Sequence, residues 1–342
     1  MTRHRDPGWT DQQVVSELII CHYNIGEVLT ICHLPLGWNN DNFLLQTADG
    51  KAYVLRRYRK QPLPERIAFE LALQTTLRRL GIPTPPVILT RNGRQYTMAY
   101  GSFWSLSAFM PGDPFQGENR EQIREAARFL GHYHATVSSV TLAEEQRWRA
   151  CCDRSWKTRN RVSFDTIAVP TSSPRLAAEV AKHRAFLLEQ GNRLKRGLPL
   201  SLYAQLPKLI IHGDYHGGNL KFVRRRIRAL LDFDNARFDA KAYDVAVGIY
   251  GFCRSQGTLK VSTELGRLFI KEYSRRYPLS TGERQTLFYF LLFRNLFSIL
   301  ALVQQGAGYP EEECLTRIRR RLEILHYLDS EGQQVIETVA NG

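Results

Sequence analysis

The sequence predicts an α+β fold in two lobes, with an antiparallel sheet and a helix in residues 1–110 and mostly helices in residues 111–342. The first observation behind this prediction is a strand–turn–strand pattern in residues 36–58, in which residues 48–50 (Ala-Asp-Gly) form the turn. The second is a succession of helical patterns in residues 263–328. A chain of 342 residues, of which 43% are apolar, is long enough to bury a sizeable core.

Capping residues and apolar periodicity place the other elements. Thr10 is the expected N-cap of a helix over residues 10–24, because a threonine hydroxyl accepts from the first free backbone N–H groups. Gly81 is expected to end a helix over residues 64–80. Further strands are predicted at 96–100, 104–109, 209–211, 220–223 and 227–231, and further helices at 120–140, 239–250, 263–277, 282–303 and 311–328.

The polar residues with the most specific spacing are His212, Asp214 and Asn219, which follow the apolar run Leu209–Ile211. His-x-Asp-x-x-x-x-Asn is the spacing of kinase catalytic loops, in which the Asp accepts the proton of the attacking hydroxyl and the Asn holds magnesium. A second apolar run delivers Asp232, where such enzymes carry their main metal-binding carboxylate. The predicted catalytic residues are therefore Asp214, Asn219 and Asp232, with Mg²⁺ held by the last two.

Two departures from the protein-kinase pattern indicate a particular family. Gly213 stands where protein kinases have Arg, and residues 232–234 read Asp-Phe-Asp rather than Asp-Phe-Gly. With these features the chain resembles the aminoglycoside phosphotransferase superfamily, which includes choline, homoserine and methylthioribose kinases and bacterial stress kinases. The resemblance implies a bilobal protein-kinase-like fold and transfer of the γ-phosphoryl group of ATP to a hydroxyl. Residues 37–43 (Gly-Trp-Asn-Asn-Asp-Asn-Phe) resemble the homoserine kinase branch and place Asn42 near the phosphates.

The resemblance also implies a nucleotide site in the first lobe. Val54 and Arg56 share one face of the strand over residues 52–58, so Val54 would touch the adenine and Arg56 would replace the usual phosphate-binding Lys. Glu70 lies where the family's helix carboxylate pairs with that cation. Ala108 to Met110 would be the linker between the lobes, whose backbone groups would bind the adenine edge. The alternative is that Arg56 is a surface arginine on an edge strand.

Three further polar residues have expected structural roles. His134 is expected to be a packed, hydrogen-bonded core residue rather than a metal ligand. In the family, a buried Asp at the position of Asp244 braces the catalytic loop, so Asp244 is expected to be structural. For Asp234 two roles remain open, a carboxylate near the metal or an ion pair with Arg237, and the ion pair is slightly favoured.

The chain carries a net charge of +14 at pH 7. Basic clusters occur at Arg56–Lys60, Arg224–Arg228 and Arg317–Arg321, but none is interleaved with aromatic residues as in a nucleic-acid module. We expect them to be solvated faces, and we expect no specific nucleic-acid partner. Residues 141–200 hold twelve Lys or Arg against six acids, which favours an anionic, zwitterionic or phosphorylated acceptor over a polycationic one.

Other features place the protein among reduced, soluble chains. The six cysteines show no C-x-x-C spacing, and the first nine residues lack the apolar core of a signal peptide. The apolar segment Leu287–Val303 is interrupted by Arg294 and Asn295, and we interpret it as a buried helix rather than a membrane span. The sequence therefore predicts a cytoplasmic protein.

Three functions fit these observations. The first is an ATP- and Mg²⁺-dependent kinase for a hydroxyl of a small molecule, homoserine-like or otherwise not polycationic. The second is a protein Ser/Thr kinase of the bacterial stress type. The third is a nucleotide-binding regulator without transfer activity, which the intact catalytic residues disfavour.

Overall fold

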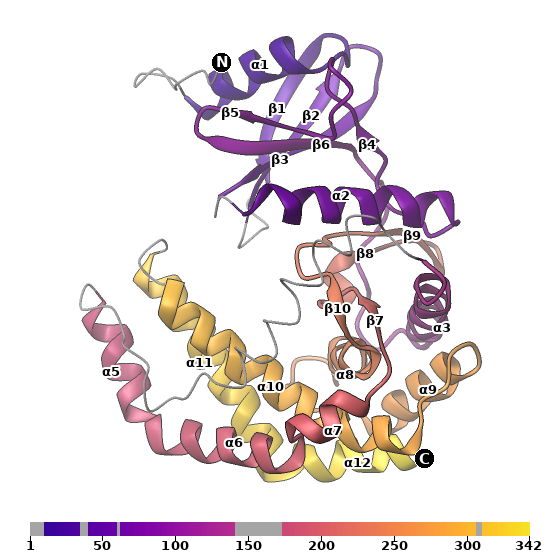
Figure 1. Cartoon of the computed structure of the whole chain (residues 1–342), viewed down its shortest axis with the longest axis vertical. Coiled ribbons are helices and arrows are strands. Elements are labelled where there is room, and N and C mark those ends of the chain that lie inside the picture. Colours follow the sequence, from indigo (N-terminus) through magenta and orange to yellow (C-terminus); the bar gives the residue numbers. More distant parts are fainter. Residues whose placement is uncertain (1–9, 35–39, 60–61, 141–172, 306–309) are drawn as a thin grey trace.

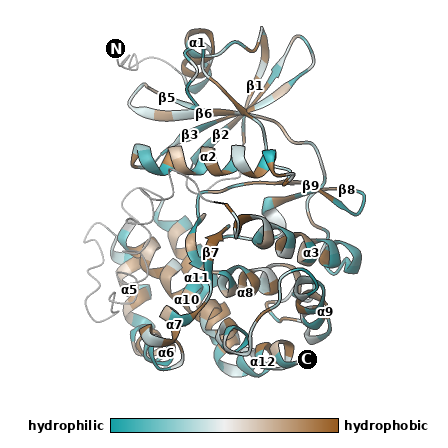
Figure 2. Cartoon of the chain, turned by 45° about the vertical axis from the view of Figure 1, so that its right-hand side comes forward, coloured by the Kyte–Doolittle hydropathy of each residue, from teal (hydrophilic) through white to brown (hydrophobic). Residues whose placement is uncertain are grey.

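The computed structural model describes residues 10–34, 40–59, 62–140, 173–305 and 310–342. An antiparallel sheet with two helices forms one lobe, and a larger, mostly helical lobe lies below it (Figure 1). The helices of both lobes carry hydrophobic as well as hydrophilic residues (Figure 2). The α+β class is therefore confirmed.

The sheet of the first lobe is antiparallel throughout, in the order β1-β2-β3-β6-β4, with β5 pairing β6. The predicted hairpin is β2–β3, whereas β1 was not predicted. Asn40 and Asn42 lie at the end of β2 away from the turn at 48–50, next to the β1–β2 connection, which lies outside the described residues. The strands are β1 (Val28–Leu34), β2 (Asn40–Thr47), β3 (Ala52–Tyr58), β4 (Val87–Ile88), β5 (Tyr96–Ala99) and β6 (Ser102–Ala108).

Helix α1 (Asp11–His22) packs on one face of this sheet. Its buried residues, including Leu18, join a core with sheet residues such as Leu55 and Trp104. Thr10 caps the helix as predicted, because its hydroxyl accepts from the Gln13 N–H in a complete capping box.

Helix α2 (Pro64–Arg79) lies between the two lobes (Figure 1). Phe69 and Leu73 belong to the core of the second lobe, whereas Ile67 packs with Tyr58 of β3. Because α2 contributes to both lobes, a boundary near residue 110 stays a prediction.

The second lobe surrounds α8 (Lys241–Phe252), in which nearly every residue is buried. Two short antiparallel pairs lie above α8, β7 (Lys208–Ile211) with β10 (Arg237–Ala240), and β8 (Leu220–Val223) with β9 (Arg226–Leu230). The other helices are α3 (Arg120–Val137), α5 (Pro174–Lys182), α6 (Arg184–Gly197), α7 (Leu200–Gln205), α9 (Thr263–Ser274), α10 (Thr281–Gln305), α11 (Glu311–Tyr327) and α12 (Gln333–Asn341).

Helix α10 contains the apolar segment singled out in the sequence. Among the described residues it is the one helix long and apolar enough to cross a membrane, but 72% of that stretch is buried within the protein. A core helix of a globular lobe has this same combination of length and burial, which agrees with the predicted buried helix.

Candidate active site

The loop after β7 is held from beneath by Asp244 of α8. Its carboxylate accepts the backbone N–H groups of His212 at 2.7 Å and Gly213 at 2.8 Å, and lies 3.3 Å from Nε2 of His134. Burial lowers the pKa of His134, so the ring is neutral at pH 7, and its Nδ1 contacts the hydroxyl of Tyr273 at 2.9 Å. The predicted packed histidine and loop-bracing carboxylate are both observed.

Gly213 is required by the shape of this loop. Its φ of +79° is in the left-handed region, and a Cβ at this position would overlap the carbonyl oxygen of Asn235. The departure from the Arg of protein kinases therefore has a steric cause, because no side chain fits between the two loops here.

The Asp214 carboxylate lies between a guanidinium and an imidazole. Arg294 of α10 donates to its Oδ1 at 2.5 Å, and Nε2 of His216 lies 3.2 Å from its Oδ2. Burial by itself would raise the pKa of Asp214, but the charge of Arg294 and the hydrogen bonds from Arg294 and His216 outweigh that effect and hold the pKa well below its usual value. Asp214 is therefore ionised at neutral pH, as a proton acceptor must be.

Asn219 closes the same loop. Its Nδ2 donates to the backbone carbonyl of Asp214 at 2.9 Å, which turns its Oδ1 to the other side. That oxygen is the type of ligand that a hard divalent cation prefers.

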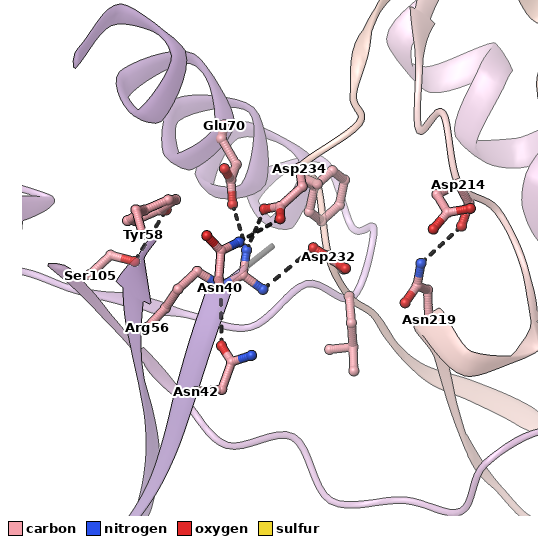
Figure 3. Close-up of polar contacts among 12 residues, drawn as sticks. Asn40, Asn42, Arg56, Tyr58, Glu70, Ser105, Asp214, Asn219, Asp232 and Asp234 are labelled. Atoms are coloured by element: carbon pink, nitrogen blue, oxygen red, sulfur yellow. Dashed lines mark hydrogen bonds and ion pairs between the residues drawn. The ribbon is translucent and has the colours of Figure 1, made fainter. Parts of the chain in front are cut away.

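Arg56 lies in a cluster of carboxylates at the cleft, drawn in Figure 3. Its guanidinium donates to Asp234 at 2.6 Å, Glu70 at 3.1 Å and Asp232 at 3.5 Å. Its Nε also donates to Oδ1 of Asn42 at 3.3 Å. The predicted Arg56–Glu70 pair is thus present, and β3 is a central strand rather than an edge strand.

The cluster holds more negative than positive charge. Burial and the nearby Asp234 raise the pKa of Glu70 to about 7 despite the attraction of Arg56. Burial and the charge of Asp232 likewise raise the pKa of Asp234 to about 6. Three carboxylates around one arginine therefore favour a further cation nearby.

Asp234 has a different partner from the one predicted. Arg237 donates to Asp239 at 2.8 Å, not to Asp234. Asp234 instead accepts from Arg56 and, at 2.5 Å, from Nδ2 of Asn40. The ion pair with Arg237 is therefore wrong, because Asp234 points across the cleft to the first lobe while Arg237 pairs with Asp239 of its own strand.

Arg66 of α2 fixes the backbone of the same segment. Its guanidinium donates to the carbonyl of Ala236 at 2.6 Å, to that of Phe233 at 3.1 Å and to that of Asp234. Both lobes therefore hold the Asp-Phe-Asp segment, so that a movement of α2 would move these carboxylates.

Asp232 lies between the Arg56 cluster and the catalytic loop (Figure 3). Its φ of +62° is unusual for a residue other than Gly, and 39% of its side chain is exposed. Asp232 and Asn219 supply oxygen ligands suited to Mg²⁺. Within the described part of the chain, no group of three His, Cys, Asp or Glu side chains holds a metal by itself, so further ligands would come from phosphates and water.

The residues predicted for the nucleotide lie along the same cleft. Val54 is half-buried on the Arg56 face of β3. The N–H of Ala108 already donates to Pro86 at 2.9 Å, and that of Phe109 donates to Ala52 at 2.9 Å. Among the described residues the Met110 N–H has no backbone acceptor, so it is the linker group left for a ligand.

A cavity of about 980 Å³ adjoins Asp214. It extends from the catalytic loop between α8, α10 and α11, and Arg294 lines it together with arginines of α11. The cluster Arg317–Arg321 was expected to be a solvated face. Arg319 pairs with Glu179 away from the cavity, and Arg317 and Arg320 line the cavity but are exposed, so all three agree with that expectation. Arg321 differs, because it is largely buried in the cavity wall. Arg317, Arg320 and Arg321 line the cavity together because positions i, i+3 and i+4 share one helical face.

Sequence reasoning missed several site residues, and only one of those discussed next has a recognisable signal in the sequence. Arg294 was visible as a charge inside an apolar helix, a position that is costly unless a partner is present. Asn40 and Arg66 gave no such signal, because polar residues at a strand end and in a first helical turn are ordinary.

Comparisons with known proteins agree with this geometry. The chain is 28% identical over 272 residues to a homoserine kinase of Caulobacter sp. (strain K31), covering 78% of each protein. It is 26% identical over 271 residues to a homoserine kinase of Zymomonas mobilis, covering 79% of each.

Solved structures share the fold. Amicoumacin kinase, in complex with AMP-PNP, Ca²⁺ and amicoumacin, superposes with a TM-score of 0.70 at 17% identity, covering 93% of this chain and 94% of that one. A microcompartment-associated aminopropanol kinase superposes with a TM-score of 0.69 at 18% identity, covering 95% and 99%. Residues 30–284 match the family model described as the phosphotransferase enzyme family. With well over half of its residues matched, and with the loop geometry described above, this chain belongs to the phosphotransferase enzyme family.

Proposed function

We propose that the protein is an ATP- and Mg²⁺-dependent kinase that phosphorylates a hydroxyl of a small molecule. The observation that carries the proposal is the ionised Asp214, which lines a cavity that reaches Glu70 and Asp234 of the Arg56 cluster. A hydroxyl entering from the cavity would meet Asp214 before it meets the nucleotide.

The chemistry divides among few residues. The acceptor oxygen attacks the γ-phosphorus, its proton passes to Asp214, and the bond to the bridging oxygen of ADP breaks. Arg56 contacts the phosphates, while Glu70 and Asp234 fix the position of its guanidinium. Mg²⁺, when bound, neutralises phosphate charge, and Asn219 and Asp232 are the residues that would hold it.

Related proteins support the nucleotide. The amicoumacin kinase structure contains AMP-PNP, and a spectinomycin phosphotransferase with a TM-score of 0.62 and 16% identity contains ADP. In a bound nucleotide, the adenine edge would accept from the Met110 N–H at the linker, and Val54 would contact the adenine ring.

The cavity favours a small acceptor over a protein. The volume of about 980 Å³ includes the nucleotide side, where Glu70 and Asp234 line it, so the part beside α10 and α11 has room for a small molecule. Homoserine is one candidate, because the relatives named homoserine kinase share 26–28% identity with this chain. That level of identity does not fix the acceptor, which is therefore identified by its fit to the cavity.

The test is ADP release from ATP and Mg²⁺ across homoserine, choline, methylthioribose, an aminoglycoside, small hydroxy acids, hydroxyalkyl phosphates and a generic protein substrate. We expect one small acceptor to stimulate release in the wild type and not in Asp214→Asn. Stimulation by the protein substrate alone would favour the protein-kinase alternative, and ATP binding without turnover on any acceptor would favour the regulator.

A further inference from the structure

The acceptor cavity is strongly basic. Five arginines line it on the side of α8, α10 and α11, whereas Asp214 is the one carboxylate among the described lining residues there. The two other lining acids, Glu70 and Asp234, belong to the Arg56 cluster at the nucleotide side. The five are Arg254, Arg294, Arg317, Arg320 and Arg321.

Arg321, one of the buried arginines of this set, has no ion-pair partner among the described residues. Arg321 donates to two neutral oxygens, Oγ of Ser298 at 3.1 Å and Oδ1 of Asn295 at 3.3 Å. Burial and the repelling charge of Arg294 lower its pKa to about 10. A buried guanidinium held beside another one, with no carboxylate of the described chain in ion-pair distance, is costly unless an anion joins it.

Arg254 has a similar surplus of donors. Its guanidinium lies 5.2 Å from the centre of the Tyr250 ring, and its Nε is buried without a hydrogen-bond acceptor among the described residues. Arg317 and Arg320 lie at the rim in exposed pairs with Glu313 and Glu323, which contribute little to stability. Both the floor and the rim of the cavity therefore offer donors to an oxyanion.

We propose that the acceptor is an anionic alcohol with net negative charge, a hydroxy acid or a hydroxyalkyl phosphate. Its oxyanion binds Arg321 and Arg254 while its hydroxyl lies at Asp214. This inference rests on the proposed kinase function only for the role of the hydroxyl, since anion binding by the cavity does not require transfer.

The charges of the residues that line the cavity favour an anionic alcohol over a zwitterionic one. A free amino acid such as homoserine carries an ammonium that five arginines repel, and its only described carboxylate neighbour is Asp214, which Arg294 already pairs. Removing the ammonium while keeping the carboxylate and hydroxyl should therefore improve binding.

The test is titration calorimetry without nucleotide, using two matched pairs of probes. The first pair is glycerol 3-phosphate against glycerol, and the second is 4-hydroxybutyrate against homoserine. We expect at least one anion to bind about tenfold or more tightly than its counterpart, and Arg321→Gln to weaken that anion about tenfold or more. Arg319→Gln is the matched control, because Arg319 is on the same helix but turns outward to Glu179.

Each outcome of the calorimetry either supports or overturns the inference that the acceptor is anionic. Tighter binding of the phosphate assigns hydroxyalkyl phosphates, and tighter binding of 4-hydroxybutyrate assigns hydroxy acids. The inference is overturned if neither anion binds better than its counterpart, or if Arg319→Gln weakens binding as much as Arg321→Gln. Arg320→Gln at the exposed rim, with an expected loss of a few-fold, replaces Arg321→Gln if that variant does not fold. Absence of turnover in the ADP assay would reject the kinase proposal and leave the calorimetric result standing.

Discussion

Replacement of Arg56 by Met tests the charge balance of the cleft. Arg56 is 20% exposed and contacts Glu70, Asp234 and Asp232, so its loss leaves buried carboxylates without their closest cation. Removing one partner of a buried ion pair costs about 3–5 kcal/mol of folding free energy. Burial and Asp234 raise the pKa of Glu70 from 4.5 to about 7 even with Arg56 present. This rise means that the folded protein disfavours the ionised form of Glu70 by on the order of 3 kcal/mol.

The assay is urea unfolding of the wild type, Arg56→Met and Arg56→Met/Glu70→Gln at pH 7. We expect the single variant to lose about 3–5 kcal/mol and the double variant to recover about 1–2 kcal/mol, because it removes one of the unpaired charges. A double variant no more stable than Arg56→Met would contradict the reasoning.

The same cluster predicts a pH dependence. The folded-state pKa values of Glu70, about 7, and Asp234, about 6, lie above their ordinary values, so the folded protein binds these protons more tightly than the unfolded chain. Their contribution to stability is therefore present in acid and is lost as the pH rises from about 4 to 7. Glu70→Gln should flatten this decline in urea midpoints measured across that range, and an unchanged or steeper decline would refute the assignment.

Three further predictions concern the catalytic loop. Arg294→Met removes the charge that keeps the pKa of Asp214 low while burial remains, so kcat/KM measured from pH 4.5 to 8 should gain an acid limb that the wild type lacks in this range; a variant without such a limb would show that Arg294 does not set this pKa. Asp244→Asn weakens two buried backbone hydrogen bonds and should lower the urea unfolding free energy by about 2–4 kcal/mol, and a loss below 1 kcal/mol would argue against the brace. Gly213→Ala should lower the urea unfolding free energy by more than about 1 kcal/mol, because φ is +79° and Asn235 blocks the methyl group. Gly50→Ala, where the methyl group would enter open space, should lower it by less than Gly213→Ala does.

The sequence predicted the parts of the site that are local in the chain. Asp214 and Asn219 lie in one short loop, so their spacing constrains them, whereas Arg56 was placed by the family resemblance together with strand alternation. The Arg56–Glu70 pair was predicted from the family resemblance, which places a helix carboxylate beside the phosphate-binding cation, and the two residues are 14 positions apart.

Contacts between distant segments could not be predicted in this way. Asp234 meets Arg56 across 178 positions, and Asp214 meets Arg294 across 80, so no periodicity relates them. Strand β1 was missed because most of its residues are at least partly exposed, so it lacks the alternation that marks a half-buried strand. The arginines of α11 that line the cavity were predictable in principle, since Arg317, Arg320 and Arg321 share a helical face and Arg319 does not.

The most direct test of the account is steady-state transfer with the best acceptor, comparing the wild type with Asp214→Asn. If Asp214 accepts the hydroxyl proton, kcat should fall about 10²–10⁴-fold while nucleotide binding stays unchanged. A variant that keeps its kcat, or that loses nucleotide binding in proportion to its activity, would contradict the assignment of Asp214 as the catalytic base.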